Sequence, residues 1–223
     1  MLLPPPIFAE VWHHVRDHNT WHVARQPGQQ QLRAQLPGVC RATLAGINEP
    51  GSGCDFLEFH RRMMRHFASI LLHVDYHPFR FEPWRGTRLP IWVETEFARR
   101  RPTFDLDAAY QRIEALVAGG DVDELGGFIE PNRLHAHEPG AGIHNTAHHV
   151  LAEAECERFC GDATATMDDL GTSPGNVLFW LLHGWIDDRY LAWQQRRGET
   201  PDLTPALMAH LGATTEERAT LDP

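Results

Sequence analysis

The five-residue string His-Asn-Thr-x-His occurs twice in this 223-residue chain, and it constrains the fold more than any other feature. One copy spans residues 18–22 and the other spans residues 144–148. Residues four apart lie one above the other on a helix, so each copy directs two imidazoles toward one point. A further histidine follows each copy inside an apolar helical pattern. The chain thus predicts a first trio and a second trio of imidazoles on four helices: His18, His22 and His60, then His144, His148 and His183.

The charged residues exclude several classes of protein. All 20 basic side chains other than histidine are arginines, so the chain has no Schiff-base lysine, no pyridoxal-phosphate anchor and no phosphate-binding loop with its lysine. A net charge of −10 argues against nucleic acid as a partner. No run of 18 apolar residues is present, so no membrane span is expected.

The cysteines and the N-terminal sequence bear on the compartment. The start, MLLPPPIF, has no basic region and no long apolar run, and is therefore unlike a signal peptide. Cys40, Cys54, Cys156 and Cys160 form no CxxC pair, and a disulfide within one helix has poor geometry. We expect four reduced thiols in a cytoplasmic protein.

Apolar periodicity and helix-terminus residues predict a mainly α fold. One domain is expected over residues 1–223, with a four-helix bundle core over about 7–195 that houses a binuclear metal site. Asp55, Asp105 and Ser173 are the expected N-caps of three helices. Helices are expected over residues 6–22 or 6–25, 55–74, 105–117, 143–160, 173–196 and 204–211. We expect one or two short helices within 29–46 and irregular chain over 77–93 and 130–142.

The remaining histidines do not share the repeated pattern. A single HxxxH string arises by chance in a chain with 15 histidines, but a duplicated string followed each time by a core histidine is much rarer. We expect surface or supporting positions for His13, His14, His66, His73, His77, His135, His137, His149 and His210. His135 and His137 precede the second string and are the alternative ligands. Sets of imidazoles suit copper and zinc, whereas di-iron sites and zincins need a Glu that neither string supplies.

Four segments resemble the type-3 copper proteins, which are tyrosinases, catechol oxidases and hemocyanins. Residues 56–67, FLEFHRRMMRHF, resemble the FLPWHR segment of that family, and Leu89-Pro90-Ile91-Trp92 is similar to its LPYW. His144-Asn145 with His148 resembles the HNxxH of the second copper site. Residues 173–187, SPGNVLFWLLHGWID, resemble SPxDPLFWLHHAxxD and are the most specific match. The resemblance keeps its order over about residues 50–195.

The resemblance implies two copper ions that use dioxygen (O2). It makes the second trio the ligands of one copper and places His60 at the other. The loop over residues 48–55 lacks the histidine that tyrosinases carry there, Asn176 replaces an Asp, and Leu182 replaces the first His of HH. An HxxxH first site, as in arthropod-type hemocyanins, makes His18 and His22 the partners of His60.

The implied activity is that of a copper oxidase or monooxygenase acting on a phenol, an o-diphenol or an o-aminophenol. Asn145 matches a family residue that, with a Glu, orients a water for removing the phenol proton. Glu138 and Glu130 are the candidates for that Glu, and the alternative role of Asn145 is to orient His144. The alternatives to an oxidase are a dioxygen- or copper-binding protein without turnover, and a histidine-ligated zinc or iron enzyme. The expected partners are a small aromatic substrate and a copper-delivery protein, and the oligomeric state is open.

Overall fold

The computed structural model describes residues 2–74, 81–131, 135–159 and 165–199. These residues form helices and contain no strand, which confirms the mainly α prediction. The elements are α1 Pro5–Arg25, α2 Gln30–Arg33, α3 Ser52–Val74, α4 Ile91–Arg100, α5 Leu106–Gly119, α6 Val122–Ile129, α7 Ile143–Phe159, a 3-10 turn Ser173–Gly175, and α8 Val177–Arg196. The predicted helix over 204–211 lies outside the described residues.

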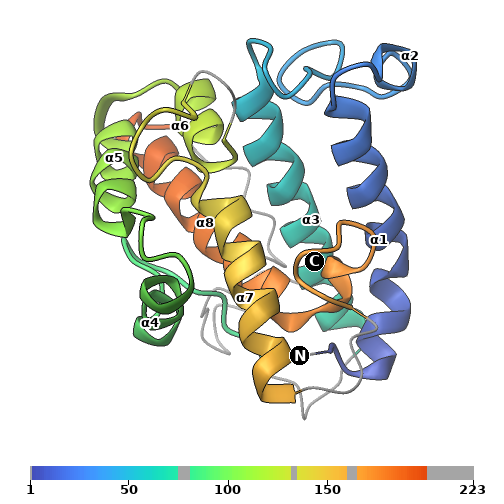
Figure 1. Cartoon of the computed structure of the whole chain (residues 1–223). Helices are drawn as coiled ribbons and strands as arrows, with labels where there is room; N and C mark the ends of the chain where they lie inside the picture. The colour runs from blue at the N-terminus through green and yellow to red at the C-terminus, as the bar shows by residue number, and fades with distance from the viewer. Residues whose placement is uncertain (1, 75–80, 132–134, 160–164, 200–223) are drawn as a thin grey trace.

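Four long helices make the core of the molecule, as Figure 1 shows. Helix α1 packs against α3, α3 packs against α8, and α8 packs against α7. The shorter helices cover this core, with α4 on α7, α5 on α8 and α6 on α3. The four core helices are the ones predicted to carry the two trios.

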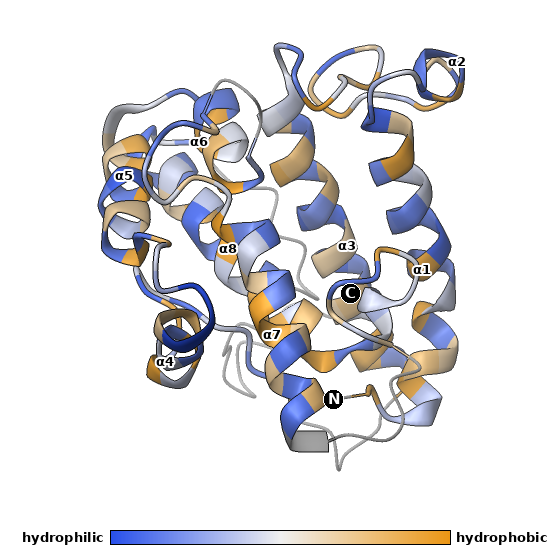
Figure 2. Cartoon of the chain, in the orientation of Figure 1, coloured by the Kyte–Doolittle hydropathy of each residue, from blue (hydrophilic) through white to orange (hydrophobic). Residues whose placement is uncertain are grey.

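The buried faces of α1 and α7 cannot be recognised from residue hydropathy alone. Figure 2 shows hydrophilic and hydrophobic stretches interleaved along α1 and α7. An amphipathic helix ordinarily sorts these onto opposite faces. Helices α1 and α7 do not, because histidine counts as hydrophilic and the buried sides of both helices carry histidines.

The start of α3 differs from the prediction. Asp55 is not its N-cap, because the helix begins at Ser52. The Asp55 carboxylate instead accepts hydrogen bonds at 2.9 Å from the backbone N–H groups of a preceding loop, at Val39, Cys40 and Ala45.

A carboxylate from another helix takes the capping role at α3. Asp123 of α6 accepts hydrogen bonds from the backbone N–H groups of Gly51 at 2.7 Å and Gly53 at 2.6 Å. Free N–H groups at a helix start favour such an anion. The same contact fixes α6 against α3.

The start of α8 is also displaced from its predicted place. Residues 173–175 form a short 3-10 turn, so Ser173 is not the N-cap. Asn176 is the N-cap, and its Oδ1 accepts a hydrogen bond from the Leu178 N–H at 2.9 Å. Its Nδ2 donates to Glu155 of α7 at 2.6 Å and so ties α7 to α8. By contrast, Asp105 caps α5 as predicted, accepting from the Ala108 N–H at 2.8 Å.

The expectation of four reduced thiols is wrong. Cys40 and Cys54 form a disulfide that joins the loop after α2 to the first turn of α3. Cys156 is exposed, and Cys160 lies outside the described residues. Disulfides persist mainly in oxidising compartments, so the thiols no longer support a cytoplasmic location. In the part of the chain that the structure describes, every helix is too short or too polar to cross a membrane.

Candidate metal centre

The structure brings both trios together in the middle of the four-helix core. Helix α1 carries two of the six histidines, α3 one, α7 two and α8 one. All six side chains are buried, with exposed fractions between 0% and 7%. Six buried imidazole rings carry a large desolvation cost unless something binds them.

The second trio converges on one point. Nε2 of His183 lies 3.4 Å from Nε2 of His144 and 3.4 Å from Nε2 of His148. The three ligand atoms all lie within 4.8 Å of one another. This is a suitable arrangement for three ligands of one ion.

The first trio does not form the predicted group of three neighbouring ligand atoms. The ring of His18 lies 4.5 Å from that of His22 and 5.6 Å from that of His60. The tight group on this side is His18, His60 and His183, while His22 is not part of it. The rings of His60 and His183 stack at 4.3 Å, so the two trios are contiguous.

Hydrogen bonds at Nδ1 orient most of the rings. Nδ1 of His60 lies 2.8 Å from the Phe56 carbonyl oxygen, and Nδ1 of His18 lies 3.1 Å from that of Leu170. Nδ1 of His148 bonds the Met167 carbonyl oxygen in the same way. A carbonyl oxygen only accepts, so these Nδ1 atoms carry the proton and their Nε2 atoms are left as lone-pair donors to a metal.

The ring atoms without an ordinary hydrogen-bond partner are the Nε2 atoms and, in addition, Nδ1 of His183. Among the described residues, Nε2 of His18, His22 and His60 is buried without a hydrogen-bond partner. In the second trio the Nε2 atoms contact only one another at hydrogen-bond distance. Native proteins rarely leave buried polar atoms unpaired, and a bound cation resolves all six at once. The residues therefore fit a metal pair.

Burial keeps these imidazoles in the form that ligation needs. It lowers the pKa of His18 to about 3 and that of His148 to about 4. It also holds the pKa of the other four well below the usual value. Metal ligation requires neutral imidazole, so the site is ready for a metal at neutral pH.

Aromatic rings wall the centre. Phe179 is fully buried and lies 4.1 Å from the ring of His183 and 5.1 Å from that of His18. Phe56 lies 4.6 Å from the ring of His60 and 4.9 Å from that of His144. These rings exclude water and strengthen electrostatic interactions inside the site.

Two buried ion pairs hold the histidine-bearing helices, and the sequence analysis did not find them. Arg25 of α1 donates to both carboxylate oxygens of Glu130, at 2.5 and 2.7 Å, and to the side chain of Ser52 on α3 at 2.6 Å. Arg61 of α3 donates to Asp187 of α8 at 2.5 Å. Their only sequence signal is position, since Arg61 follows His60 and Asp187 lies one helical turn after His183.

The two predicted catalytic residues lie in different surroundings. Asn145 is exposed, and its Oδ1 accepts from Nδ1 of His144 at 2.8 Å. This contact supports the alternative role, in which Asn145 orients His144.

Glu138 binds His135 at 2.5 Å and Arg112 at 2.9 Å, and no described contact joins it to either trio. Those two partners hold the Glu138 pKa below its usual value against the opposing effect of partial burial. Glu130 lies closer, with Oε1 4.0 Å from Nδ1 of His22.

Most other histidines lie outside the centre, as expected. His135 is engaged by Glu138, and neither it nor His137 joins a metal-type group among the described residues. His14 differs from the expectation of a surface or supporting residue, because it is buried and clusters with His13 and His66. His77 and His210 lie outside the described residues.

A comparison with known families tests the resemblance. Residues 98–196 match the family model of the common central domain of tyrosinase. The resemblance to type-3 copper proteins is confirmed over this segment. The tyrosinase-like segment contains the whole second trio and none of the first. No similar protein was found among the curated proteins, and none among the solved structures.

Proposed function

We propose that this protein is a dioxygen-using binuclear copper oxidase that acts on a small phenol, o-diphenol or o-aminophenol. The observation that carries the proposal is the set of six buried imidazoles whose Nε2 atoms have no partner except one another. All-imidazole sets suit copper, and the tyrosinase-like segment points to the same metal.

In this proposal the first trio holds one copper and the second trio holds the other. Copper ions held there would supply the two electrons that reduce dioxygen and the oxidising capacity that acts on the aromatic substrate. The protein's part is to hold four of the rings by their Nδ1 hydrogen bonds, to keep all six neutral by burial, and to exclude water with Phe179 and Phe56.

Removal of the substrate proton is assigned to Asn145 in the first turn of α7 and to Glu138 in the loop before that helix. Asn145 is exposed, and its amide oxygen accepts a hydrogen bond from Nδ1 of the buried His144. Glu138 remains the predicted partner of Asn145, and Glu130 is its alternative because of its place beside His22. Asn145→Ala tests this role: it should slow hydroxylation of a monophenol by about 10²–10⁴-fold while o-diphenol oxidation falls less. Equal losses on both substrates would leave Asn145 only the task of orienting His144.

Burial of the centre favours a second candidate function. The most exposed of the six histidines are His148 at 7% and His22 at 6%, so a ring-sized substrate has little room at the described surface. This low exposure fits a protein that has the same copper pair but binds dioxygen without oxidising a substrate.

Metal analysis and oxygen uptake together decide among the functions. The purified protein is loaded with copper, its metal content is measured, and oxygen consumption is followed with catechol, o-aminophenol and a simple monophenol. The oxidase proposal expects copper in both trios and uptake with at least one substrate. His183→Ala should abolish uptake, whereas His149→Ala, which removes an exposed histidine of the same helix as His148, should not.

Copper in both trios without uptake would select the binding protein. Zinc or iron in place of copper after purification, retained against added copper, would select the third alternative of the sequence analysis.

A further inference from the structure

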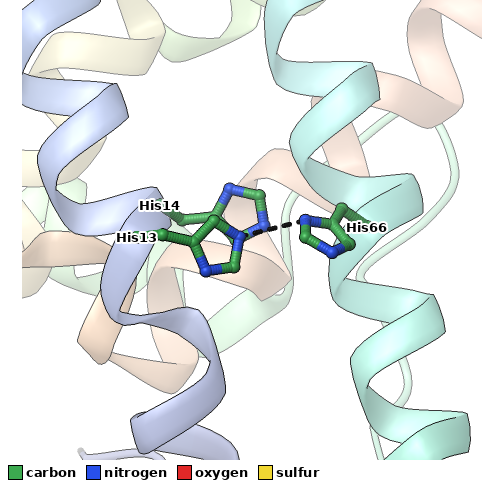
Figure 3. A group of neighbouring side chains, drawn as sticks. All are labelled: His13, His14 and His66. Atoms are coloured by element: carbon green, nitrogen blue, oxygen red, sulfur yellow. Dashed lines mark hydrogen bonds between the residues drawn. The ribbon is translucent and has the colours of Figure 1, made fainter.

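A third group of histidines lies apart from both trios, between α1 and α3 (Figure 3). His13 and His14 come from α1, and His66 faces them from α3. Their ring centres are separated by 4.2 Å for the two on α1, and by 4.8 Å from each of these to His66. One ligand atom from each lies within 4.8 Å of the others.

The hydrogen bonding of this cluster is incomplete without a further partner. Nε2 of His13 lies 3.1 Å from Nδ1 of His66, and this contact accounts for two of the three rings. His14 is only 6% exposed, and its Nε2 is buried without a hydrogen-bond partner among the described residues. A simple histidine pair on the surface would not explain a third, buried imidazole held beside it.

The cluster has the chemistry of a metal site with one open side. Burial and the neighbouring histidines lower the pKa of His14 to about 3, so this ring is neutral and able to ligate at pH 7. Exposure rises from the buried His14 through the half-buried His13 to the exposed His66. An ion at about 2.0–2.1 Å from each nitrogen needs its ligand atoms roughly 2.9–3.4 Å apart in tetragonal or tetrahedral geometry, which small side-chain rotations reach from the observed spacing.

We propose that His13, His14 and His66 bind a single copper ion in a third, mononuclear site that keeps one position open to solvent. Imidazole suits several transition metals, and the affinity order of divalent ions puts copper above zinc. Neither trio shares a ligand with this site.

Buried aromatic rings pack against the inner side of the third site. Trp180 of α8 lies 5.8 Å from the ring of His14, and Phe67 stacks on Trp180 at 4.0 Å. Both of these apolar rings are fully buried. The third site shares no ligand with either trio, so the inference does not rest on the proposed oxidase activity.

The test is a comparison of two exposed histidines on the same helix. His66→Ala removes a ligand of the third site, and His73→Ala removes an exposed histidine of α3 that is outside the cluster. Both side chains are exposed, so both variants should fold, which circular dichroism checks. Each variant and the wild type are dialysed to equilibrium against Cu²⁺ at pH 7, and copper per chain is quantified.

The proposal expects His66→Ala to hold one copper per chain fewer than His73→Ala, which should match the wild type. This difference of one copper ion per chain is expected whether or not the two trios bind copper. A failure of the third site can therefore be told apart from a failure of the proposed oxidase function. Equal copper in the two variants would overturn the third site. An equal loss in both would do the same, because it would mean unspecific binding to surface histidines.

Discussion

His144 and His148 each place Nε2 3.4 Å from the same atom, Nε2 of His183, whereas the Nε2 atoms of the first trio have no partner among the described residues. The two trios nevertheless begin from the same five-residue string. Only the second lies in the tyrosinase-like segment. Identical local sequence therefore gives identical helix geometry, while the approach of the third histidine depends on how the helices pack.

The contacts that orient the histidine rings of the two strings differ as well. Nδ1 of His144 bonds the Asn145 side chain next to it, whereas Nδ1 of His18 bonds the Leu170 carbonyl oxygen from a distant loop. The first trio is also braced by the Arg25–Glu130 ion pair beside His22. The second copy of the string thus orients His144 through its own Asn145, whereas His148 and His18 depend on carbonyl oxygens that lie far away in the sequence.

Acid should affect the metal-free protein most strongly, and through both trios alike. The pKa is about 3 for His18 and about 4 for His148 in the folded protein, against about 6.5 in an unfolded chain. A lowered folded-state pKa means that stability is present above about pH 6.5 and is lost as the pH falls toward the folded value. Each such imidazole costs up to about 1.4 kcal/mol per pH unit in that window.

Urea unfolding of the metal-free protein between about pH 7 and 5 measures this effect. His18→Phe and His148→Phe should each flatten the pH dependence by the share of one imidazole. If one variant kept the wild-type change of unfolding free energy with pH, the histidine it replaces would not be buried in its neutral form. The expectation that both trios respond alike to acid would then be contradicted.

Glu130→Ala should destabilise the protein by about 3–5 kcal/mol, because it leaves the Arg25 guanidinium buried without its counter-charge. Chemical denaturation measures the free energy of unfolding. Glu138→Ala is the matched control, since its partner Arg112 is well exposed and the change should be within about 1 kcal/mol. A loss below about 1 kcal/mol for Glu130→Ala would show that the first trio does not depend on this ion pair.

Removing the disulfide should cost about 3 kcal/mol, the value expected for a closed loop of roughly 15 residues. The two cysteines are separated by 14 positions, and the bridge fastens only the side of the molecule that carries the first trio. The double variant Cys40→Ser with Cys54→Ser should lower Tm, while Cys156→Ser should not. The comparison of the trios would be contradicted if the double variant also removed copper from the second trio.

Asn145→Ala should weaken copper binding in the second trio by about 10–100-fold, the usual effect of removing the partner of a ligating histidine. Asn19→Ala is the control at the same place in the first copy. His18 is oriented by Leu170 instead, so copper affinity should stay unchanged there. Titration with a competing chelator gives both affinities, and equal losses would mean that the two asparagines act alike.

The sequence was sufficient to predict that the six histidines come together on four helices, because the helix geometry and the repeated string are both local features. It also predicted the Asp105 cap for the same reason. The Asp55 cap was wrong because a loop from outside the helix takes that carboxylate, and a capping residue from α6 replaces it. Local propensity cannot reveal such exchanges between distant segments.

Helix α6 was missed because it is short and contains Gly126 and Gly127 in its interior. The fold needs a glycine there, since a Cβ on Gly126 would lie 2.0 Å from the Gly53 oxygen. The tight grouping of His183 with members of both trios was equally out of reach, because it depends on the place of α8 between α3 and α7.

Copper content per chain tests the central claim, that each trio binds one copper, most directly. His18→Ala and His144→Ala are compared with His149→Ala, which removes an exposed histidine of α7. The three proteins are loaded with copper together, and copper and protein are quantified after removal of unbound metal. We predict that His18→Ala and His144→Ala each hold one copper fewer than His149→Ala. If either retained as much copper as His149→Ala, the trio that carries the changed residue would not be a copper site, and the binuclear centre would be contradicted.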